Sequence, residues 1–224
     1  MHSEGFKIIG LTRSIEKTED LFKKHNIDNY QLLVFDHDRI EEVHSILDSI
    51  YKDNNPQHLI IYDGYHHLKP LRQESHDSIL QMYKSNVSIP LIICKEFAKK
   101  VKQNKSPNKS ITLMSSIAAI KGEPALVSYS ASKGAIISAV KSMSRELAKD
   151  NIRVNSLCPG WIESDRTKKL RRIMSDSNLR RLESEYPLGL GDVNDTSSVI
   201  SFLISDGSRW VTGQNIILDG GITS

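Results

Sequence analysis

Short apolar runs alternate with longer amphipathic segments along almost the whole chain, and this alternation limits the possible folds most strongly. The apolar runs, which we expect to be buried strands, lie at 6–11, 30–35, 58–62, 110–114, 152–157 and 215–219. The segments with the spacing of amphipathic helices lie at 15–25, 40–51, 74–102, 129–149 and 195–204. Strands that alternate with helices through short connections predict a parallel sheet covered on both faces. The expected fold is one α/β domain over residues 1–224, with a doubly wound parallel sheet.

The composition excludes several classes of protein. The 224 residues include 30 basic and 27 acidic residues, so the chain has no basic excess that would predict nucleic-acid binding. No apolar run approaches the length of a membrane span, and the first residues do not have the pattern of a signal peptide. Cys94 and Cys158 lie far apart without metal-ligand spacing, so we expect reduced thiols and no metal site. These features predict a cytoplasmic protein without membrane or nucleic-acid partners.

Tyr129 and Lys133, in "VSYSASKGA", are the first candidates for chemistry. They lie four residues apart in an expected helix, so their side chains share one face. An ammonium about 5 Å from a phenol, at an effective dielectric near 20, favours the phenolate by roughly 3 kcal/mol, or about two pKa units. Such a phenol can exchange a proton with an alkoxide. An isolated pair of this kind is more often an exposed surface pair, so the spacing alone leaves both interpretations open.

A wider pattern supports the catalytic interpretation. Ser116 follows the apolar run "ITLM", thirteen residues before Tyr129. Together Ser116, Tyr129 and Lys133 resemble the Ser…Tyr-x-x-x-Lys signature of the short-chain dehydrogenase/reductase family. The stretches "NIRVNSLCPGWIESD" and "PLGLGDVNDTSSVISFLISDGSRWVTGQNIILDGG" are similar to the family's Pro-Gly loop and C-terminal region. The resemblance extends from about residue 3 to the end of the chain. Within the family, the sequence is similar to 3-oxoacyl-carrier-protein reductases. The resemblance implies a Rossmann-like fold.

The resemblance implies a role for each catalytic candidate. Tyr129 would be the general acid in ketone reduction and the general base in alcohol oxidation, and Ser116 would polarise the carbonyl group. Lys133 would lower the pKa of the tyrosine and hold the ribose hydroxyls of the nicotinamide. Asn86, in "YKSNVSIP", matches a helix asparagine that supports a proton-relay water. The alternative for Asn86 is a kink in the helix ahead of Pro90.

The same resemblance implies a binding site for NADP or NAD. Pro159 and Gly160 match the loop beside the nicotinamide, and Ile162 and Ser164 would face its amide group. Gly64 matches the last position of the family's Asn-Asn-Ala-Gly segment.

Two residues near the expected adenosine end bear on the choice of cofactor. Arg13 follows the first apolar run, where a cation suits a 2′-phosphate and favours NADP over NAD. Asp36 matches an acidic residue that contacts adenine, and a helix cap is the alternative interpretation.

The sequence also departs from the family pattern. The opening "MHSEGFKIIGLTRS" resembles the end of the family's first helix and its second strand, so the chain lacks about two dozen residues with the first strand and the glycine-rich loop. The missing strand would lie between those that begin near Phe6 and His58, which predicts strand edges left unpaired or forced together. In "IIYDG", Ile61 and Asp63 replace small or amide residues, and Asp63 would bring a negative charge near the ribose.

The segment 165–187 occupies the family's variable substrate lid. It contains seven basic and four acidic residues, which suits a carbonyl or alcohol substrate on an anionic carrier, or alternatively a solvated helical face. The long helices and the C-terminal segment predict a homo-oligomer, a dimer or a tetramer. Two functions remain open at this stage. The first is an NADP-linked oxidoreductase, and the second is a non-catalytic relative that acts as a binding subunit.

Overall fold

The computed structural model describes residues 5–62 and 64–224, and three parallel sheets organise them. The first sheet contains β1 (Ile8–Thr12) and β2 (Tyr30–Val34). The second has the order β3-β4-β5-β8, with β3 (His58–Ile61), β4 (Lys109–Met114), β5 (Ile152–Pro159) and β8 (Asn215–Leu218). A third, small sheet pairs β6 (Ile162–Glu163) with β7 (Gly191–Asp192).

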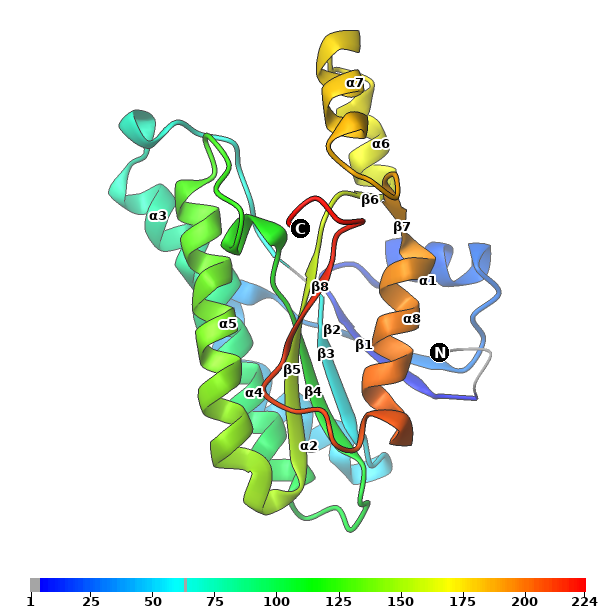
Figure 1. Ribbon diagram of the computed structural model, residues 1–224. Helices are drawn as coiled ribbons and strands as arrows, with labels where there is room; N and C mark the ends of the chain where they lie inside the picture. Colours follow the sequence, from blue (N-terminus) through cyan, green and yellow to red (C-terminus); the bar gives the residue numbers. More distant parts are fainter. Residues whose placement is uncertain (1–4, 63) are drawn as a thin grey trace.

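Helices cover both faces of the four-stranded sheet (Figure 1). The α-helices are α1 (Ile15–Lys24), α2 (Val43–Asp53), α3 (His76–Tyr83), α4 (Ile89–Val101), α5 (Val127–Leu147), α6 (Asp165–Arg171), α7 (Asp176–Ser184) and α8 (Val193–Ile204). The short helices are η2 (His37–Glu42), η3 (Leu71–Gln73), η4 (Lys84–Ser88), η5 (Ile117–Ala119), η6 (Ala148–Asp150) and η7 (Asp206–Ser208). Helices α2, α4 and α5 lie on one side and α1 and α8 on the other, which confirms the doubly wound parallel fold.

The core is centred on the two strands that have a partner on each side. Every residue of β4 is buried, and so are the first seven residues of β5. Ile111 and Val154 of these strands pack in one cluster with Phe97 of α4 and Val140 of α5. Because helices cover both faces, these strands have no solvent-facing side, which explains the apolar runs at these positions in the sequence.

The two larger sheets do not join. Within the described residues, β1 pairs with β2 and β3 pairs with β4, and no ladder connects β1 to β3. All five residues of β1 and the first three of β3 are only half-buried. A groove of about 1540 Å³ lies between them. Of the two alternatives that the sequence left open, strand edges unpaired or forced together, the described residues show the first.

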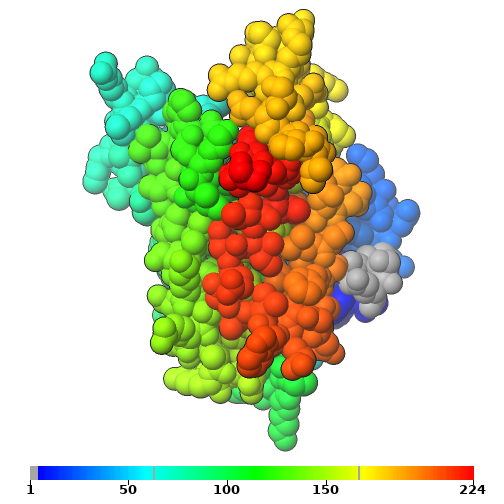
Figure 2. All heavy atoms as spheres, viewed as in Figure 1, coloured from blue at the N-terminus to red at the C-terminus, as the bar shows by residue number. Residues whose placement is uncertain are grey.

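Two further features complete the fold. Helices α6 and α7, which form most of segment 165–187, project beyond the body of the molecule, and the C-terminal residues fill the space between α5 and α8 (Figure 2). Cys94 and Cys158 are free and buried, and burial raises the pKa of the Cys94 thiol to about 12. None of the helices that the structure describes is long and apolar enough to cross a membrane.

Candidate functional site

The site lies where β4 ends and α5 begins. Ser116 follows β4 and caps η5, with its Oγ accepting a hydrogen bond of 3.2 Å from the backbone N–H of Ala118. Helix α5 begins at Val127, so Tyr129 and Lys133 lie in its first two turns. Small side chains on this part of α5 let the helix approach the sheet closely, and Ser132 is fully buried there.

Lys133 is a buried cation. It is only 4% exposed, and its Nζ donates a 3.0 Å hydrogen bond to the carbonyl oxygen of Met114 at the end of β4. The same Nζ lies 5.8 Å from the centre of the Tyr129 ring. The Oγ of Ser115 donates a 2.9 Å bond to the Lys133 carbonyl, which fixes this turn of α5 against the strand. The predicted common face of Tyr129 and Lys133 is confirmed.

Gly64 brings the loop after β3 against the same lysine. A Cβ atom at Gly64 would lie 3.0 Å from Lys133 Nζ and 3.5 Å from Asn86 Oδ1. A side chain at this position would have to displace one of these polar groups. Glycine is therefore the residue that lets this loop approach the ammonium, and Gly64 lies beside both Lys133 and Asn86.

Asn86 ties this loop to the helices. It lies in the π-helical segment η4, between α3 and α4, and is 1% exposed. Its Oδ1 accepts from the backbone N–H of Tyr65 at 2.7 Å, and its Nδ2 donates to the Tyr65 carbonyl at 2.8 Å and to Ser132 Oγ at 3.0 Å. The helix is thus irregular ahead of Pro90, as the alternative interpretation stated, and π-helical turns are frequent at functional sites. The structure places Asn86 beside Gly64 and Lys133, with its amide committed to these bonds.

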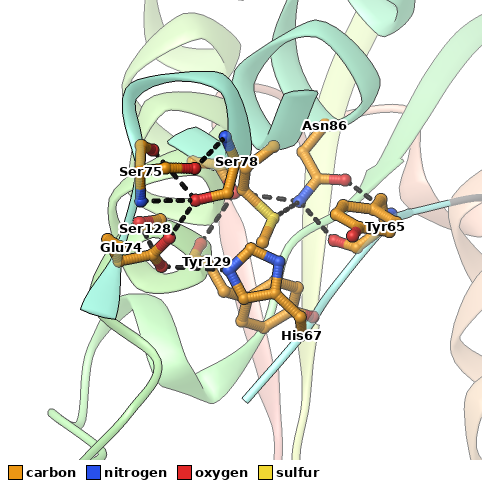
Figure 3. A network of polar contacts seen from close by, with 10 residues as sticks. Tyr65, His67, Glu74, Ser75, Ser78, Asn86, Ser128 and Tyr129 are labelled. Carbon is orange, nitrogen blue, oxygen red and sulfur yellow. Dashed lines mark hydrogen bonds and ion pairs between the residues drawn. The ribbon is translucent and has the colours of Figure 1, made fainter. Parts of the chain in front are cut away.

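A polar network on the segment 65–78 was not found by sequence reasoning (Figure 3). The Glu74 side chain is 3% exposed and accepts hydrogen bonds from Ser78 Oγ, His67 Nε2 and Ser128 Oγ, at 2.5, 3.0 and 2.8 Å. The bond from Ser78, and then that from His67, lowers the pKa of the Glu74 carboxyl to about 2. Since Ser128 precedes Tyr129, the network holds this segment against the start of α5.

The segment 65–78 also contacts the candidate catalytic tyrosine directly. The ring centres of His66 and Tyr129 lie 5.7 Å apart, with a tilted geometry. The backbone N–H of Lys69 donates a 2.8 Å bond to the carbonyl of Ala125, just before α5. In the sequence, "ESHDS" carries the Ser75–Ser78 spacing of a helix cap, and this was the one available signal for the network.

The loop after β5 is shaped by Gly160. A Cβ atom there would lie 2.9 Å from Tyr186 Cε1 and 3.1 Å from the Cα of Asp219, so the packing of this loop requires glycine. The next residue, Trp161, donates its backbone N–H to Tyr186 Oη at 2.9 Å. Pro159 ends β5, and Ile162 begins β6.

Ser164 and Asp36 both act as helix caps. Ser164 Oγ accepts from the backbone N–H of Thr167 at the start of α6, at 3.3 Å. Asp36 is exposed and accepts from the N–H of Asp38 at 3.0 Å, so the alternative interpretation of Asp36 describes its contact. Arg13 is exposed at the carboxyl end of β1, on the rim of the groove. Asp63 lies outside the described residues.

With this geometry established, comparison with known proteins defines the family. Residues 1–223 match the family model described as enoyl-(acyl carrier protein) reductase. The chain belongs to the short-chain dehydrogenase/reductase family. It is 32% identical over 234 residues to the 3-oxoacyl-(acyl-carrier-protein) reductase FabG of Thermotoga maritima, which covers 98% of this chain and 88% of the relative. A tropinone reductase homolog of Arabidopsis thaliana is 42% identical over 118 residues, which covers 52% of this chain and 42% of that one.

Solved structures of dehydrogenases share the fold. A 4-hydroxyisoleucine dehydrogenase mutant complexed with NADH and succinate superimposes with a TM-score of 0.88 at 28% identity, covering 99% of this chain and 90% of that one. A gluconate 5-dehydrogenase from Burkholderia cenocepacia in complex with NADP and tartrate gives a TM-score of 0.89 at 23% identity, covering 99% and 87%. The Rossmann-like architecture of the chain is thus that of the family.

The Glu74 network generates a prediction about stability and pH. Its carboxyl pKa is lowered from 4.5 to about 2 in the folded protein, so its ionised form stabilises the fold at neutral pH, and that contribution is lost as the pH falls from about 4.5 to about 2. We expect Glu74→Gln to lower the free energy of unfolding at pH 6, and we expect the difference from the parent protein to shrink at pH 3. Urea denaturation at the two pH values measures this difference.

The matched control is Glu123→Gln, which replaces a carboxylate near the same end of α5 that pairs with Lys121 at the half-buried surface. Its effect at pH 6 should be smaller, because partly exposed ion pairs contribute little. A difference between Glu74→Gln and the parent that stays constant from pH 6 to pH 3 would contradict the role of the Glu74 carboxylate.

Proposed function

We propose that the protein is an NAD(P)-dependent oxidoreductase that interconverts a ketone and a secondary alcohol. The observation that carries this proposal is the buried Lys133 ammonium, whose Nζ lies 5.8 Å from the centre of the Tyr129 ring. This ammonium lies at the end of β4, the strand that Ser116 follows. Membership of a family with 3-oxoacyl-(acyl-carrier-protein) reductases supports it, as does the fold shared with a dehydrogenase complexed with NADH.

Tyr129 and Ser116 act on the same substrate oxygen in this proposal. Tyr129 gives its phenolic proton to the carbonyl oxygen during reduction and takes it back during oxidation. Ser116 Oγ already accepts from Ala118, but a hydroxyl also has one hydrogen to donate, and that hydrogen polarises the carbonyl group. The bound nicotinamide supplies or accepts the hydride at the carbon atom.

Lys133 favours the phenolate form of Tyr129 by its charge. The Nζ atom lies 5.8 Å from the centre of the ring, and a positive charge this close favours the ionised phenol because the interior screens it less than water does. We propose that Asn86 supports the water molecule of a proton relay. Its bonds to Tyr65 and Ser132 also make it a positioning residue for the loop at Gly64.

The residues present fit the nicotinamide end of the cofactor. Gly64 and Gly160 stand where a Cβ atom would crowd the neighbouring groups, so glycine lets the loop after β3 approach Lys133 and lets the loop after β5 pack against Tyr186 and Asp219. We propose that Pro159, Ile162 and Ser164 border the nicotinamide. Lys133 would hold its ribose.

At the adenosine end the fit is weaker. Arg13 and Asp36 are both exposed there, and the Asp36 side chain already caps η2. Arg13 supports NADP rather than NAD, and Asp36 remains a proposed contact for adenine.

The basic residues of the lid, segment 165–187, support the proposal that the substrate is bound to an anionic carrier, such as acyl carrier protein or coenzyme A. Within it, Arg171 pairs with Glu163 and Glu183, and Arg181 pairs with Glu185. Among the lid side chains that the structure describes, the exposed basic ones are Lys168, Lys169, Arg172, Arg180 and Arg181. We further propose one catalytic domain in a cytoplasmic homo-oligomer, built through α4, α5 and the C-terminal segment.

A second candidate function is a non-catalytic binding subunit of the same family. The open groove between β1 and β3 favours it, because within the described residues the two sheets that would hold the two ends of a dinucleotide do not join.

Cofactor binding is tested first. We expect titration with NADPH to quench the fluorescence of Trp161, which lies beside the Gly160 loop, with saturation below millimolar concentration. The Trp210→Phe background removes the signal of the other tryptophan, which is 92% exposed. In Arg13→Ala the affinity for NADPH should fall while that for NADH stays constant. No saturable change at millimolar NADPH would exclude the enzyme in favour of the binding subunit.

Catalysis is tested with Tyr129→Phe, which removes the phenolic proton. We expect kcat to fall by at least roughly 100-fold, the usual contribution of a general acid, while the Kd for NADPH changes little. Tyr65→Phe is the matched control, since Tyr65 lies on the adjacent loop and is exposed. Equal activity of Tyr129→Phe and Tyr65→Phe would refute the assignment of Tyr129.

A further inference from the structure

Two strand edges face each other across the groove between the larger sheets, and they run in the same direction. At the amino ends, the rings of Phe6 and His58 lie 6.2 Å apart, and Lys7 Nζ donates a 2.5 Å bond to Asn54 Oδ1. At the other end of the groove, the last residues of β1 and β3 line the same cavity. The open edges therefore form a parallel pair with space between them.

The exposure of the neighbouring strands indicates that the groove lacks a strand. Strand β4 has a partner on each side and all six of its residues are buried, whereas β1 has one partner and all five of its residues are half-buried. An open edge carries backbone N–H and C=O groups without a ladder partner, and it binds extended chains readily. Both sides of the groove present such an edge.

The walls of the groove fix the chemistry of an occupant. On one face the lining includes Ile89, Pro90 and Ile93 of α4, and on the other it includes Ile200 and Ile204 of α8. A strand between two such faces has no solvent-exposed side, so its sequence must be a nearly continuous apolar run.

The charges around the groove indicate in which direction an inserted strand would run. The basic lining residues are Lys7, Arg13, Lys17, His37 and His58, and the described lining contains no aspartate or glutamate. Arg13 and Lys17 are exposed at the carboxyl end of β1 and in the first turns of α1. Acidic residues at the carboxyl end of an inserted strand would lie beside them.

We propose that this groove binds an extended apolar segment of a partner protein, a chain different from this one, as a central parallel strand. Acidic residues that follow the segment then lie beside Arg13 and Lys17. The inserted strand pairs with β1 on one side and β3 on the other, and it joins the two larger sheets into one. Because Gly64 lines both the groove and the Lys133 site, the occupant also steadies the loop at the catalytic candidates.

Hydrogen exchange with a synthetic peptide tests the proposal without any activity assay. The probe is acetyl-Ser-Val-Val-Ile-Val-Val-Asp-Glu-amide, added to the full chain. We expect slower exchange for the amides of residues 8–12 and 58–61. The amides of residues 215–218 should not change, because β8 is an outer edge of its sheet and does not face the groove. A peptide with proline at the two central positions is the control, because proline cannot donate to a ladder.

Charge reversal tests the direction of insertion. In Arg13→Glu/Lys17→Glu, both side chains are exposed, so the fold should persist. We expect about tenfold weaker binding of the Asp-Glu peptide and tighter binding of the same peptide ending in Lys-Lys.

Four results would overturn the proposal. The first is no protection at millimolar peptide, and the second is equal protection by the proline peptide. The third is protection confined to 30–34 or 215–218, which would place the peptide on an outer edge. The fourth is protection that rises with protein concentration without peptide, which would make a second copy of the chain the occupant.

Discussion

A lysine that is 4% exposed sits where four elements meet, and its charge has to be accommodated there. Removing an ammonium group from water costs several kcal/mol unless polar groups replace the water. Lys133 gains the carbonyl of Met114 from β4, lies near the ring of Tyr129 on α5, and approaches Gly64 and the Asn86 amide. The requirement to solvate this one charge explains why a glycine, a buried asparagine and a strand end converge on the start of α5.

The scaffold divides the proposed site into two parts that differ in burial. Ser116, Tyr129 and Lys133 rest on β4, β5 and α5, the best-packed part of the molecule. Arg13 and Asp36 lie at the ends of the two-stranded sheet, on the other side of the groove. The proposed catalytic residues are thus held by the core, whereas the adenosine end of a dinucleotide would depend on how firmly the β1–β2 sheet is held. This division is the physical reason why two functions remain in competition.

Local pattern was enough to predict the main elements. All six expected strands are present, because a strand buried on both faces must be apolar throughout, and such runs are visible in sequence. The expected helix 74–102 is instead α3, η4 and α4, because Asn86 and Pro90 interrupt its regular hydrogen bonding. The helices α6 and α7 were not among the expected elements, because charged residues dominate their sequence and few apolar residues mark the amphipathic face of α7.

The Glu74 network could not be predicted for a different reason. Its central bond joins Ser128 to a carboxylate 54 residues away, and no local pattern specifies such a contact. The common helix face of Tyr129 and Lys133 could be predicted, because it follows from a spacing of four residues. The burial of Lys133 could not, since it depends on the loop at Gly64 and on β4.

The ionisation of Tyr129 tests the account most directly. Protein labelled with carbon-13 at the tyrosine Cζ allows each of the seven phenols to be titrated by NMR. Burial raises the pKa of Tyr51, Tyr62 and Tyr186, so a phenol that ionises early stands apart. We predict one resonance that titrates below the ordinary value near 10, is absent in Tyr129→Phe, and moves back toward 10 in Lys133→Met. A Tyr129 resonance that titrates at or above 10 in the parent protein would contradict the account.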